Sequence, residues 1–254
     1  MIDFHCHILP GLDDGAPDLD ESLAMARLLA AAGFTHVCCT PHQLRGMYET
    51  PPAAMRQALN ALQQQLTSEN IPITLLPGFE YCLDEFFIDD FSAEPVALGS
   101  GRRVLVETPA NADPQLLRQN IFHLVRSGYV PLFAHPERHA FLAPPDRTSE
   151  SFFGRVKVWN RQSEEGGESL SGTLLAELQL MGCEFQGNLG SVGGYYGSLV
   201  RQQEQRLRQS NLYACYGSDG HNVASLNKFL TAALALVEHS SGFRLNRQPE
   251  LIAP

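Results

Sequence analysis

The sequence of 254 residues is poor in lysine and in long apolar runs. Only Lys157 and Lys228 are present, and 18 Lys and Arg against 28 Asp and Glu give a formal net charge of −10. Binding to nucleic acid without regard to sequence needs a basic stripe, which this composition does not supply. No stretch approaches the roughly 18 uninterrupted apolar residues of a membrane helix. We therefore expect neither a nucleic-acid partner nor membrane insertion.

Secretion signals and disulfide frameworks are also missing. The N-terminus reads MIDFHCHILPGLDD and has no basic segment followed by an apolar one, which a secretory signal requires. The six cysteines form no C-x-x-C pair and show no regular spacing. Reduced, buried thiols and a cytoplasmic location are the expected consequences.

Short β-rich runs alternate with longer helical stretches along the chain. Strands at intervals of roughly 30 residues that alternate with helices indicate βαβ units and a parallel sheet. Seven such units favour closure into a barrel, although an open doubly wound sheet would give a similar pattern. The expected strands are Ile2–Cys6, Thr35–Thr40, Ile73–Leu76, Val104–Glu107, Val130–Ala134, Cys183–Gln186 and Tyr213–Tyr216. The expected helices lie within 18–33, 53–66, 114–128 and 174–182.

One interval is too long for this rhythm. Residues 143–172 are rich in Pro, Ser, Glu and Gly and show neither strand nor helix periodicity. We interpret them as a flexible excursion inserted into a single domain that spans 1–254. For the first helix, Asp18 and Glu21 predict a capping box, and Gly33 predicts the end. For the second, Thr50 is the expected cap and Pro51 the first helical residue.

Histidine and acidic residues occur repeatedly where the expected strands end. Active sites of barrels and of open α/β sheets lie at the carboxyl ends of their strands, so these side chains are expected to converge. Burying so many ionisable groups together is costly unless cations compensate. The pattern therefore predicts a metal cluster. Its candidates are His5, His7, Asp13 or Asp14, His42, Glu80, Glu107, His135, Asp219 and His221.

The order HCH, DD, TPH, GFE, VE, AHPER, SDGH resembles the polymerase-and-histidinol-phosphatase (PHP) superfamily of trinuclear metallohydrolases. Within it, GLDDGAPDLDESL, TPHQLRGMYETP and AHPER resemble the bacterial capsule-type branch of protein-tyrosine phosphatases. The resemblance implies an α/β fold, a distorted seven-stranded (β/α)7 TIM-like barrel. It also implies a phosphomonoester hydrolase whose substrate is the phosphotyrosine-containing tail of a bacterial tyrosine kinase that controls capsule or exopolysaccharide synthesis.

The resemblance further implies three divalent ions. One set of ligands would be His5, His7, Glu80 and Asp219; a second would be Glu80, Glu107 and His135; a third would be Asp14, His42 and His221. Manganese is the first expectation, with iron, zinc, cobalt and magnesium as alternatives, since all accept nitrogen and oxygen ligands. A metal-bound hydroxide would attack the phosphoryl group, and the ions would attract a phosphate that the acidic chain alone would repel.

Two arginines are candidates for contact with the substrate. Arg138 follows His135 by three residues, and its guanidinium fork can bind two phosphoryl oxygens and stabilise the transferred charge. Arg45 lies in the loop after the second expected strand and is a weaker candidate for a phosphate contact. For Arg138 the alternative is a surface arginine paired with Glu137 or Glu150.

Three other functions compete with this interpretation. Cys39 and Arg45 satisfy C-x5-R, the minimal signature of phosphatases that use a thiolate, but the motif lacks phosphate-cradling glycines and Pro41 removes an amide. A PHP-type phosphatase acting on a small phosphoester such as histidinol phosphate would keep the metals and change the substrate. A metal-dependent binding protein is the non-enzymatic possibility, disfavoured because a structural site closes its coordination.

Overall fold

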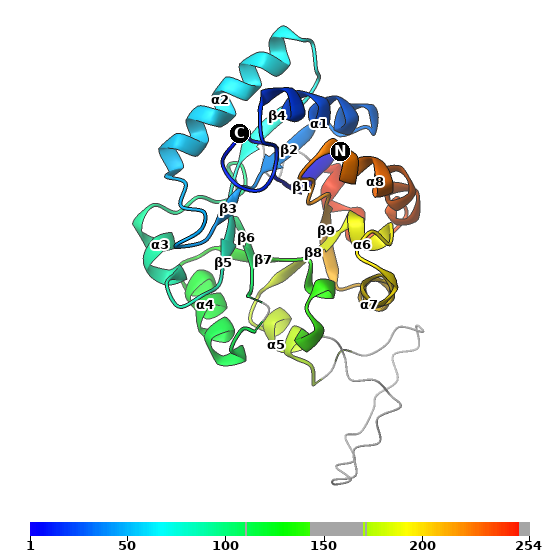
Figure 1. Cartoon of the computed structure of the whole chain (residues 1–254). Helices are drawn as coiled ribbons and strands as arrows, with labels where there is room; N and C mark the ends of the chain where they lie inside the picture. The colour runs from blue at the N-terminus through cyan, green and yellow to red at the C-terminus, as the bar shows by residue number, and fades with distance from the viewer. Residues whose placement is uncertain (110, 143–169, 171, 249–254) are drawn as a thin grey trace.

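The computed structural model describes residues 1–109, 111–142, 170 and 172–248 (Figure 1). The excursion expected at 143–172 thus lies almost entirely outside the described residues. The remainder forms a mixed α/β fold in which the strands surround a common centre and the helices lie outside them. No helix in the described part of the chain has the length and apolar character needed to span a membrane.

The nine strands in the described part of the chain form two parallel sheets. One has the order β1 (Ile2–Cys6), β2 (His36–Cys39), β4 (Thr74–Pro77). The other has the order β3 (His42–Gln43), β5 (Glu80–Cys82), β6 (Arg103–Glu107), β7 (Val130–Ala134), β8 (Glu184–Asn188), β9 (Tyr213–Gly217). The parallel α/β pattern expected from the sequence is therefore present, and all seven expected strands are found to within two residues.

Two short strands continue expected strands from one sheet into the other. After β2, Thr40 and Pro41 lead directly into β3, and Pro41 has no N–H to donate to a ladder. After β4, Gly78 and Phe79 lead into β5. A Cβ on Gly78 would lie 2.6 Å from the Leu98 side chain, so this crossing needs a glycine. The chain thus changes sheets twice, and each change places a candidate ligand on the second short strand.

The hydrogen-bonded ladders do not close into one barrel. Between β1 and β9, which we call the β1–β9 seam, there is one isolated bridge, Cys6 to Gly220. Backbone bonds from Asp219 N to His5 O (2.7 Å) and from His7 N to Gly220 O (3.0 Å) reinforce it. The buried Asp3 carboxylate accepts the Ser218 N–H at 2.8 Å across the same seam. The Asp3 side chain therefore supplies part of the hydrogen bonding that a regular ladder between β1 and β9 would provide.

Eight α-helices in the described residues cover the outside of the strands. They are α1 (Leu19–Ala31), α2 (Pro52–Ser68), α3 (Phe87–Ala93), α4 (Pro114–Arg126), α5 (Leu174–Leu180), α6 (Leu189–Val192), α7 (Ser198–Gln209) and α8 (Val223–Val237). Short 3-10 turns follow at η1 (Pro136–Arg138), η2 (Ala140–Leu142), η3 (Ser241–Phe243) and η4 (Leu245–Arg247). The four expected helices are α1, α2, α4 and α5, while α3, α6, α7 and α8 were not predicted.

The helix ends correct two details of the sequence interpretation. Asp18 caps α1 by accepting the Glu21 N–H at 2.9 Å, but the Glu21 carboxylate accepts the Val223 N–H at 2.7 Å and does not return to Asp18. The predicted capping box is thus half formed, because the glutamate joins α1 to α8. For α2 the cap is Pro51, without a side-chain bond, and Thr50 does not serve. Gly33 has φ 92° and follows the last residue of α1 as predicted.

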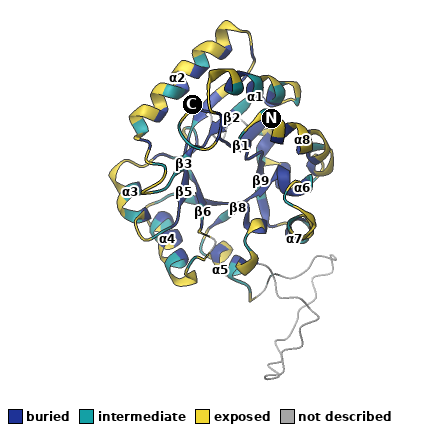
Figure 2. Ribbon diagram, in the orientation of Figure 1, coloured by how far each residue is buried: buried dark blue, intermediate teal, exposed yellow. Residues whose placement is uncertain are grey.

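The core has two parts, and the smaller one is shared by both sheets. A large cluster packs the outer faces of the strands against the helices. A second cluster includes Phe4 and Cys38 from the first sheet together with Leu105, Leu132 and Cys215 from the second. Figure 2 shows the strands buried while the outer helix faces are exposed. Both sheets therefore enclose one interior. All six cysteines are free and buried, as expected.

Candidate metal centre

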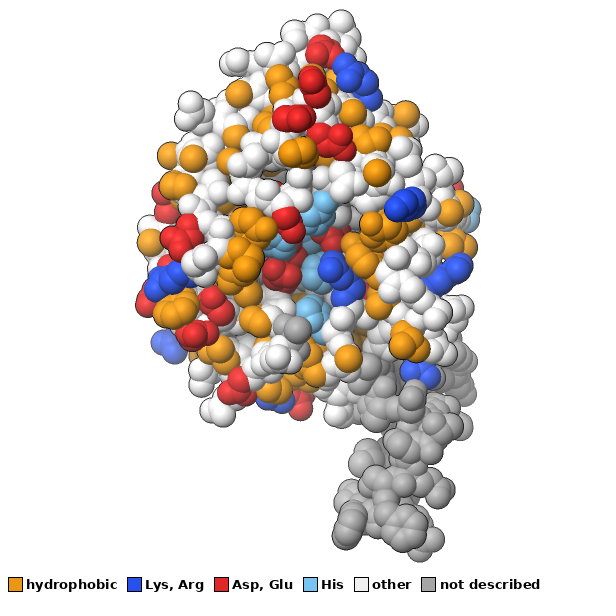
Figure 3. Space-filling view, in the orientation of Figure 1, with side chains coloured by type: hydrophobic (Ala, Val, Ile, Leu, Met, Phe, Trp, Pro, Cys, Tyr) orange, Lys and Arg blue, Asp and Glu red, His pale blue; other side chains and the backbone are white. Residues whose placement is uncertain are grey.

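The nine predicted ligands converge at the carboxyl ends of the strands. Histidine and acidic side chains gather at the centre of the face viewed in Figure 3, with a basic side chain at the margin. Four strands and three loops contribute to this cluster. His5, His42, Glu80 and Glu107 lie on strands, His135 and Asp219 follow β7 and β9, and Asp14 precedes α1.

One deeply buried group consists of His5, His7, Glu80 and Asp219, which we call the inner group. Their residues are 0 to 5% exposed, and one donor atom from each lies within 4.8 Å of the others. His5 Nε2 is 3.0 Å from His7 Nε2 and 3.0 Å from Glu80 Oε2. Asp219 Oδ1 is 3.3 Å from Nε2 of both histidines. Two nitrogens and two oxygens thus face a common point.

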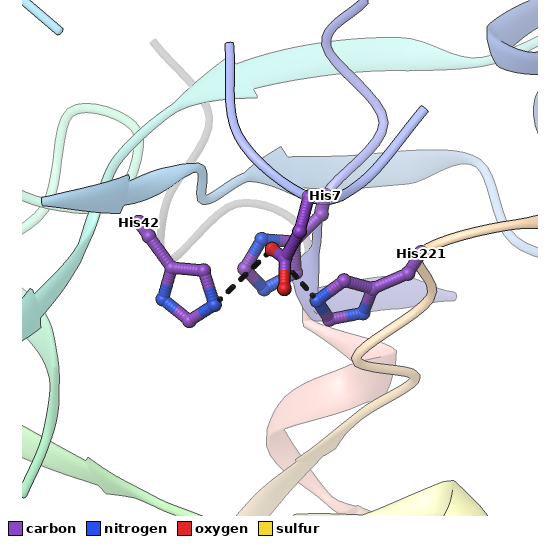
Figure 4. A group of neighbouring side chains, drawn as sticks. His7, His42 and His221 are labelled. Carbon is purple, nitrogen blue, oxygen red and sulfur yellow. Dashed lines mark ion pairs between the residues drawn. The ribbon is translucent and has the colours of Figure 1, made fainter. Parts of the chain in front are cut away.

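A second group joins His7 to Asp14, His42 and His221. We call Asp14, His42 and His221 the outer group. Asp14 Oδ1 lies 3.5 Å from His42 Nε2 and 3.4 Å from His221 Nε2. Figure 4 shows the rings of His42, His7 and His221 gathered around one carboxylate. The residues implied by the resemblance for a third ion therefore do lie together, and His7 stands between them and the inner group.

Glu80 and Glu107 connect the remaining ligands. His135 Nε2 is 3.0 Å from Glu80 Oε1 and 4.0 Å from Glu107 Oε2. His42 Nδ1 is 3.2 Å from both Glu80 Oε2 and Glu107 Oε1, so His42 also belongs with this pair. His135 thus lies near both carboxylates of the implied set, but the group whose ligand atoms all lie within 4.8 Å of one another is His42, Glu80 and Glu107, with His42 in place of His135. Glu80 reaches every part of the cluster, which is the arrangement that a bridging carboxylate needs.

Residues outside the predicted set hold the imidazoles in orientation. Asp13 Oδ2 lies 2.6 Å from His7 Nδ1 and accepts the His42 N–H at 2.9 Å. Gly15 passes so close that a Cβ there would lie 2.2 Å from the His7 carbonyl oxygen. The sequence placed Asp13 in the correct loop but did not show that it orients His7. Metal-binding histidines usually donate their second N–H to a carboxylate or carbonyl, which fixes the ring and the tautomer.

The same arrangement recurs at two more histidines. His5 Nδ1 faces the Gln186 side-chain oxygen at 3.1 Å, and His221 Nδ1 donates to the Asp219 carbonyl at 2.9 Å. In each case Nδ1 is engaged, and Nε2 is left to bind an ion. The buried Gln186 on β8 was missed by the sequence interpretation. Its only signal was a polar side chain within an otherwise buried strand.

The electrostatics of the inner group call for positive charge. Burial opposes protonation of His5, yet Glu80 and Asp219 outweigh it and raise the pKa of His5 to about 9. Burial also opposes ionisation of Glu80 and Asp219, but the adjacent histidines hold the pKa of both carboxyls well below the usual range. Buried carboxylates that stay ionised need cations close by. Imidazole nitrogen with carboxylate oxygen is a donor set that suits divalent manganese, iron, cobalt or zinc.

The backbone is strained at two of the ligands. His135 has φ 35° and ψ 53°, and Asp219 has φ 51°, both in the left-handed region that side chains with a Cβ rarely adopt. Such residues typically cost about 1–3 kcal/mol each and persist where the surrounding structure over-determines them. Functional sites are where this strain concentrates, in agreement with the predicted role of both residues.

Arg138 lies at the edge of the cluster, on the η1 turn. Its Nη1 donates to Asp219 Oδ2 at 2.7 Å, and its guanidinium carbon lies 4.5 Å from the centre of the Tyr196 ring. Asn188 Nδ2 at 2.8 Å and the Tyr196 hydroxyl at 3.3 Å donate to the same oxygen. Thus Asp219 presents Oδ1 to the histidines while three donors hold Oδ2. The Arg138 side chain remains 36% exposed and is open to a further anion.

Arg45 is placed differently. Its Nε donates to Asp90 Oδ2 at 3.2 Å, and its guanidinium lies over the Phe86 ring at 4.4 Å. Both partners come from α3 and the residue before it, so the guanidinium is engaged there.

The thiolate alternative also loses support at this point. Cys39 is fully buried in the core, and burial raises the pKa of its thiol, whereas a nucleophilic thiolate needs access and a lowered pKa.

Comparison with known proteins agrees with this geometry. A family model for capsular polysaccharide synthesis, CpsB/CapC, matches residues 1–150. The tyrosine-protein phosphatase YwqE of Bacillus subtilis (strain 168) is 33% identical over 246 residues, covering 96% of this chain and 87% of that protein. The tyrosine-protein phosphatase CpsB of Streptococcus pneumoniae is 24% identical over 251 residues, covering 95% and 91% respectively.

A solved structure matches along almost the whole chain. It comes from work on YwqE of Bacillus subtilis and CpsB of Streptococcus pneumoniae, described as metal-dependent tyrosine phosphatases. The TM-score is 0.79 at 32% identity, and the match covers 99% of this chain and 94% of that one. Sequence motifs, fold and the side-chain cluster thus agree, and this chain belongs to the CpsB/CapC family of capsular polysaccharide synthesis proteins.

Proposed function

We propose that this protein is a metal-dependent protein-tyrosine phosphatase that hydrolyses phosphotyrosine monoesters. The observation that carries the proposal is the cluster of nine nitrogen and oxygen ligands with the half-exposed Arg138 at its edge. A purely structural metal site would close its coordination and would not keep an arginine open beside it. The names of the relatives, all tyrosine-protein phosphatases, point to the same reaction.

The ligand groups support three divalent ions, with manganese as the first candidate. The inner group would hold one ion. Glu80, Glu107 and His135 would hold a second, with Glu80 bridging, and the outer group would hold the third. The contacts of Glu80 with four histidines support the bridge. When bound, the ions supply an activated water as nucleophile and positive charge for the phosphoryl oxygens.

The protein's own groups would orient the substrate and stabilise charge. Asp13 and Gln186 fix the two inner imidazoles, so that the ligand nitrogens need not reorganise. Arg138 would bind the transferred phosphoryl group through its planar fork, and Asp219 holds that fork in position. Arg45 remains a candidate for a contact with the peptide part of a substrate, in exchange for its pairing with Asp90.

We also infer that the two sheets act as a distorted (β/α)7 barrel. Counting β2 with β3 and β4 with β5 leaves seven strand positions around the shared interior, and the β1–β9 seam brings the first and last together. The barrel would place every ligand at one rim. The free thiols support a reducing compartment, the cytoplasm. There the substrate would be the phosphorylated tail of a tyrosine kinase that regulates capsule or exopolysaccharide synthesis.

The test is hydrolysis by protein reconstituted with Mn²⁺ after chelation. We expect release of phosphate from phosphotyrosyl peptides, with kcat/KM higher than for phosphoseryl peptides of the same sequence or for histidinol phosphate. Activity should vanish with EDTA and return with metal, and elemental analysis should approach three ions per chain. Preference for histidinol phosphate would instead assign the protein to small phosphoesters, and activity that survives chelation would contradict the metal mechanism.

A further inference from the structure

An aromatic cavity opens beside Arg138, next to the proposed metal ligands. Its volume is about 210 Å³, and Asp219 and His221 line the side toward the cluster. Tyr195, Tyr196 and Phe229 line it with aromatic rings. We call these three residues the aromatic pocket. Of the three, Tyr196 contacts the inner group, through its hydroxyl to Asp219 Oδ2 at 3.3 Å.

The walls of the pocket are fixed in position. Helix α6 and its C-cap contain glycines that allow very close packing: a Cβ on Gly190 would lie 2.8 Å from the Tyr196 ring, and one on Gly193 would lie 2.6 Å from Phe229 Cβ. Tyr196 is further held by its hydrogen bond to Asp219 and by the guanidinium of Arg138 over its ring. A substrate would thus meet a preformed surface.

Tyr195 is the wall that the fold itself uses least. Its ring meets Tyr196 edge-on with centroids 5.1 Å apart and lies 5.6 Å from the centroid of Phe229, yet 42% of the residue is exposed. Lys228 Nζ lies over the Tyr195 ring at 5.6 Å from its centroid, and the rest of this half-exposed aromatic side chain offers surface to a further ring. Aromatic pairs of this kind prefer centroid separations of about 4.5–7 Å and contribute about 0.5–1.5 kcal/mol.

We propose that the aromatic pocket receives the phenyl ring of phosphotyrosine, and that Tyr195 thereby selects aryl over alkyl phosphomonoesters. The inference rests on the proposed phosphatase function and names the part of the site that recognises the leaving group. Arg138 belongs both to the cluster edge and to the pocket wall, so a phosphoryl group bound by it would bring its ester substituent to the pocket. A phosphoserine carries no ring to fill the pocket and gains nothing from Tyr195.

Binding of two inert phosphonates to metal-loaded protein tests the pocket without catalysis. Benzylphosphonate carries a ring and methylphosphonate does not, and calorimetry gives the Kd of each. For Tyr195→Ala we expect the Kd of benzylphosphonate to rise about 2- to 12-fold, the equivalent of one lost aromatic pair, with the Kd of methylphosphonate unchanged. Tyr195→Phe should bind both like the parent. Leu199→Ala, which removes an exposed apolar side chain from α7, is the control.

Kinetics with a phosphotyrosyl peptide supply the second readout. In Tyr195→Ala the loss should appear in KM, with metal content unchanged and kcat close to the parent. Equal weakening of both phosphonates, or no weakening of either, overturns the pocket. The Tyr48 ring stacks on that of His42, with centroids 5.5 Å apart, and so lies beside the outer group. A selective loss of benzylphosphonate binding in Tyr48→Ala would place the phenyl group there instead. If the parent hydrolyses no phosphotyrosyl peptide, the proposed function fails, whereas the phosphonate arm still decides whether the pocket binds aryl groups.

Discussion

The inner and outer groups use the same kinds of ligand in opposite surroundings. Residues of the inner group are at most 5% exposed, whereas the Asp14 and His221 side chains are 52% and 25% exposed. Both histidines of the inner group are held through Nδ1 by Asp13 or Gln186, while the outer carboxylate Asp14 faces the two imidazoles that it would share with an ion. If both groups bind ions as proposed, the closed inner group would retain its ion, and the open outer group would admit substrate and exchange its ion more readily.

The largest effect should come from breaking the inner group at Glu80. Glu80→Ala removes the carboxylate that contacts His5, His42 and His135, so those imidazoles lose the anion that draws cations to them. We expect phosphatase activity below detection and a clear loss of bound metal by elemental analysis, with the circular dichroism spectrum retained. Glu94→Ala, which removes an exposed carboxylate paired with Arg56, is the control. Near-normal turnover by Glu80→Ala would refute the bridging role.

Arg138 sharpens the comparison because it touches the inner group and also faces solvent. At saturating metal, Arg138→Ala should keep its ions and lose about 10²–10³ in kcat, the usual cost of removing a preorganised donor to a transition state. Arg138→Lys should recover only part of this, since an ammonium lacks the planar fork. Metal content that falls in parallel with activity even at saturation would instead make Arg138 a support for Asp219.

Asp13 links the two halves, since its carboxylate contacts the His7 ring and the His42 backbone. Asp13→Asn should weaken metal binding about 10- to 100-fold, as is typical when the partner of a metal-binding histidine is changed. Activity should recover when the metal concentration is raised, unlike that of Glu80→Ala. A titration of activity against Mn²⁺ measures this directly, and a defect that excess metal does not correct would assign Asp13 a direct part in the reaction.

The smallest effect concerns a buried carboxyl away from the cluster. Glu204 on α7 is buried, and burial raises its pKa from 4.5 to about 7 despite the ion pair with Arg208. The folded state therefore holds this proton more tightly than the unfolded state does. The resulting contribution to stability is fully present below pH 4.5 and is lost as the pH rises through about 7.

Glu204→Gln should remove that dependence. At pH 8 the variant should be about 2–3 kcal/mol more stable than the parent, and at pH 4.5 the two should be alike. Thermal unfolding of parent and variant at both values measures the difference. Glu177→Gln, which alters an exposed glutamate paired with Arg118, controls for the substitution itself. A difference independent of pH would show that Glu204 is ionised throughout.

Much of the site could be predicted from the sequence because the ends of the strands could be located in it. The regular spacing of apolar runs located seven strands, and parallel strands bring their carboxyl ends to one rim, so His5 and His135 could be expected to meet although they are far apart in sequence. The orienting residues carried no such signal. Asp13 resembles any loop aspartate, and Gln186 is one polar residue in a buried strand, so their roles depend on distances that only the fold defines.

The missed elements have physical causes as well. Strands of two or three residues, such as β3, are shorter than any periodicity can reveal. Helix α7 is rich in Gln and Arg, and two of its three buried residues are Gln203 and Glu204, so few apolar residues mark its inner face in the sequence. Whether the strands close into a barrel could not be predicted from the sequence, because barrels and open sheets share the same alternation of strands and helices. In the structure the β1–β9 seam depends on Asp3 and on a single bridge.

The β1–β9 seam also makes any ion in the inner group a cross-link. It would tie His5, near the beginning of the chain, to Asp219, across a loop as long as the separation of 214 residues between Cys6 and Gly220 at the same seam. A link that closes a loop of more than about 100 residues removes chain entropy from the unfolded state equivalent to about 5 kcal/mol. Metal loading should therefore hold β1 and β9 together, and chelation should loosen the fold first at the β1–β9 seam.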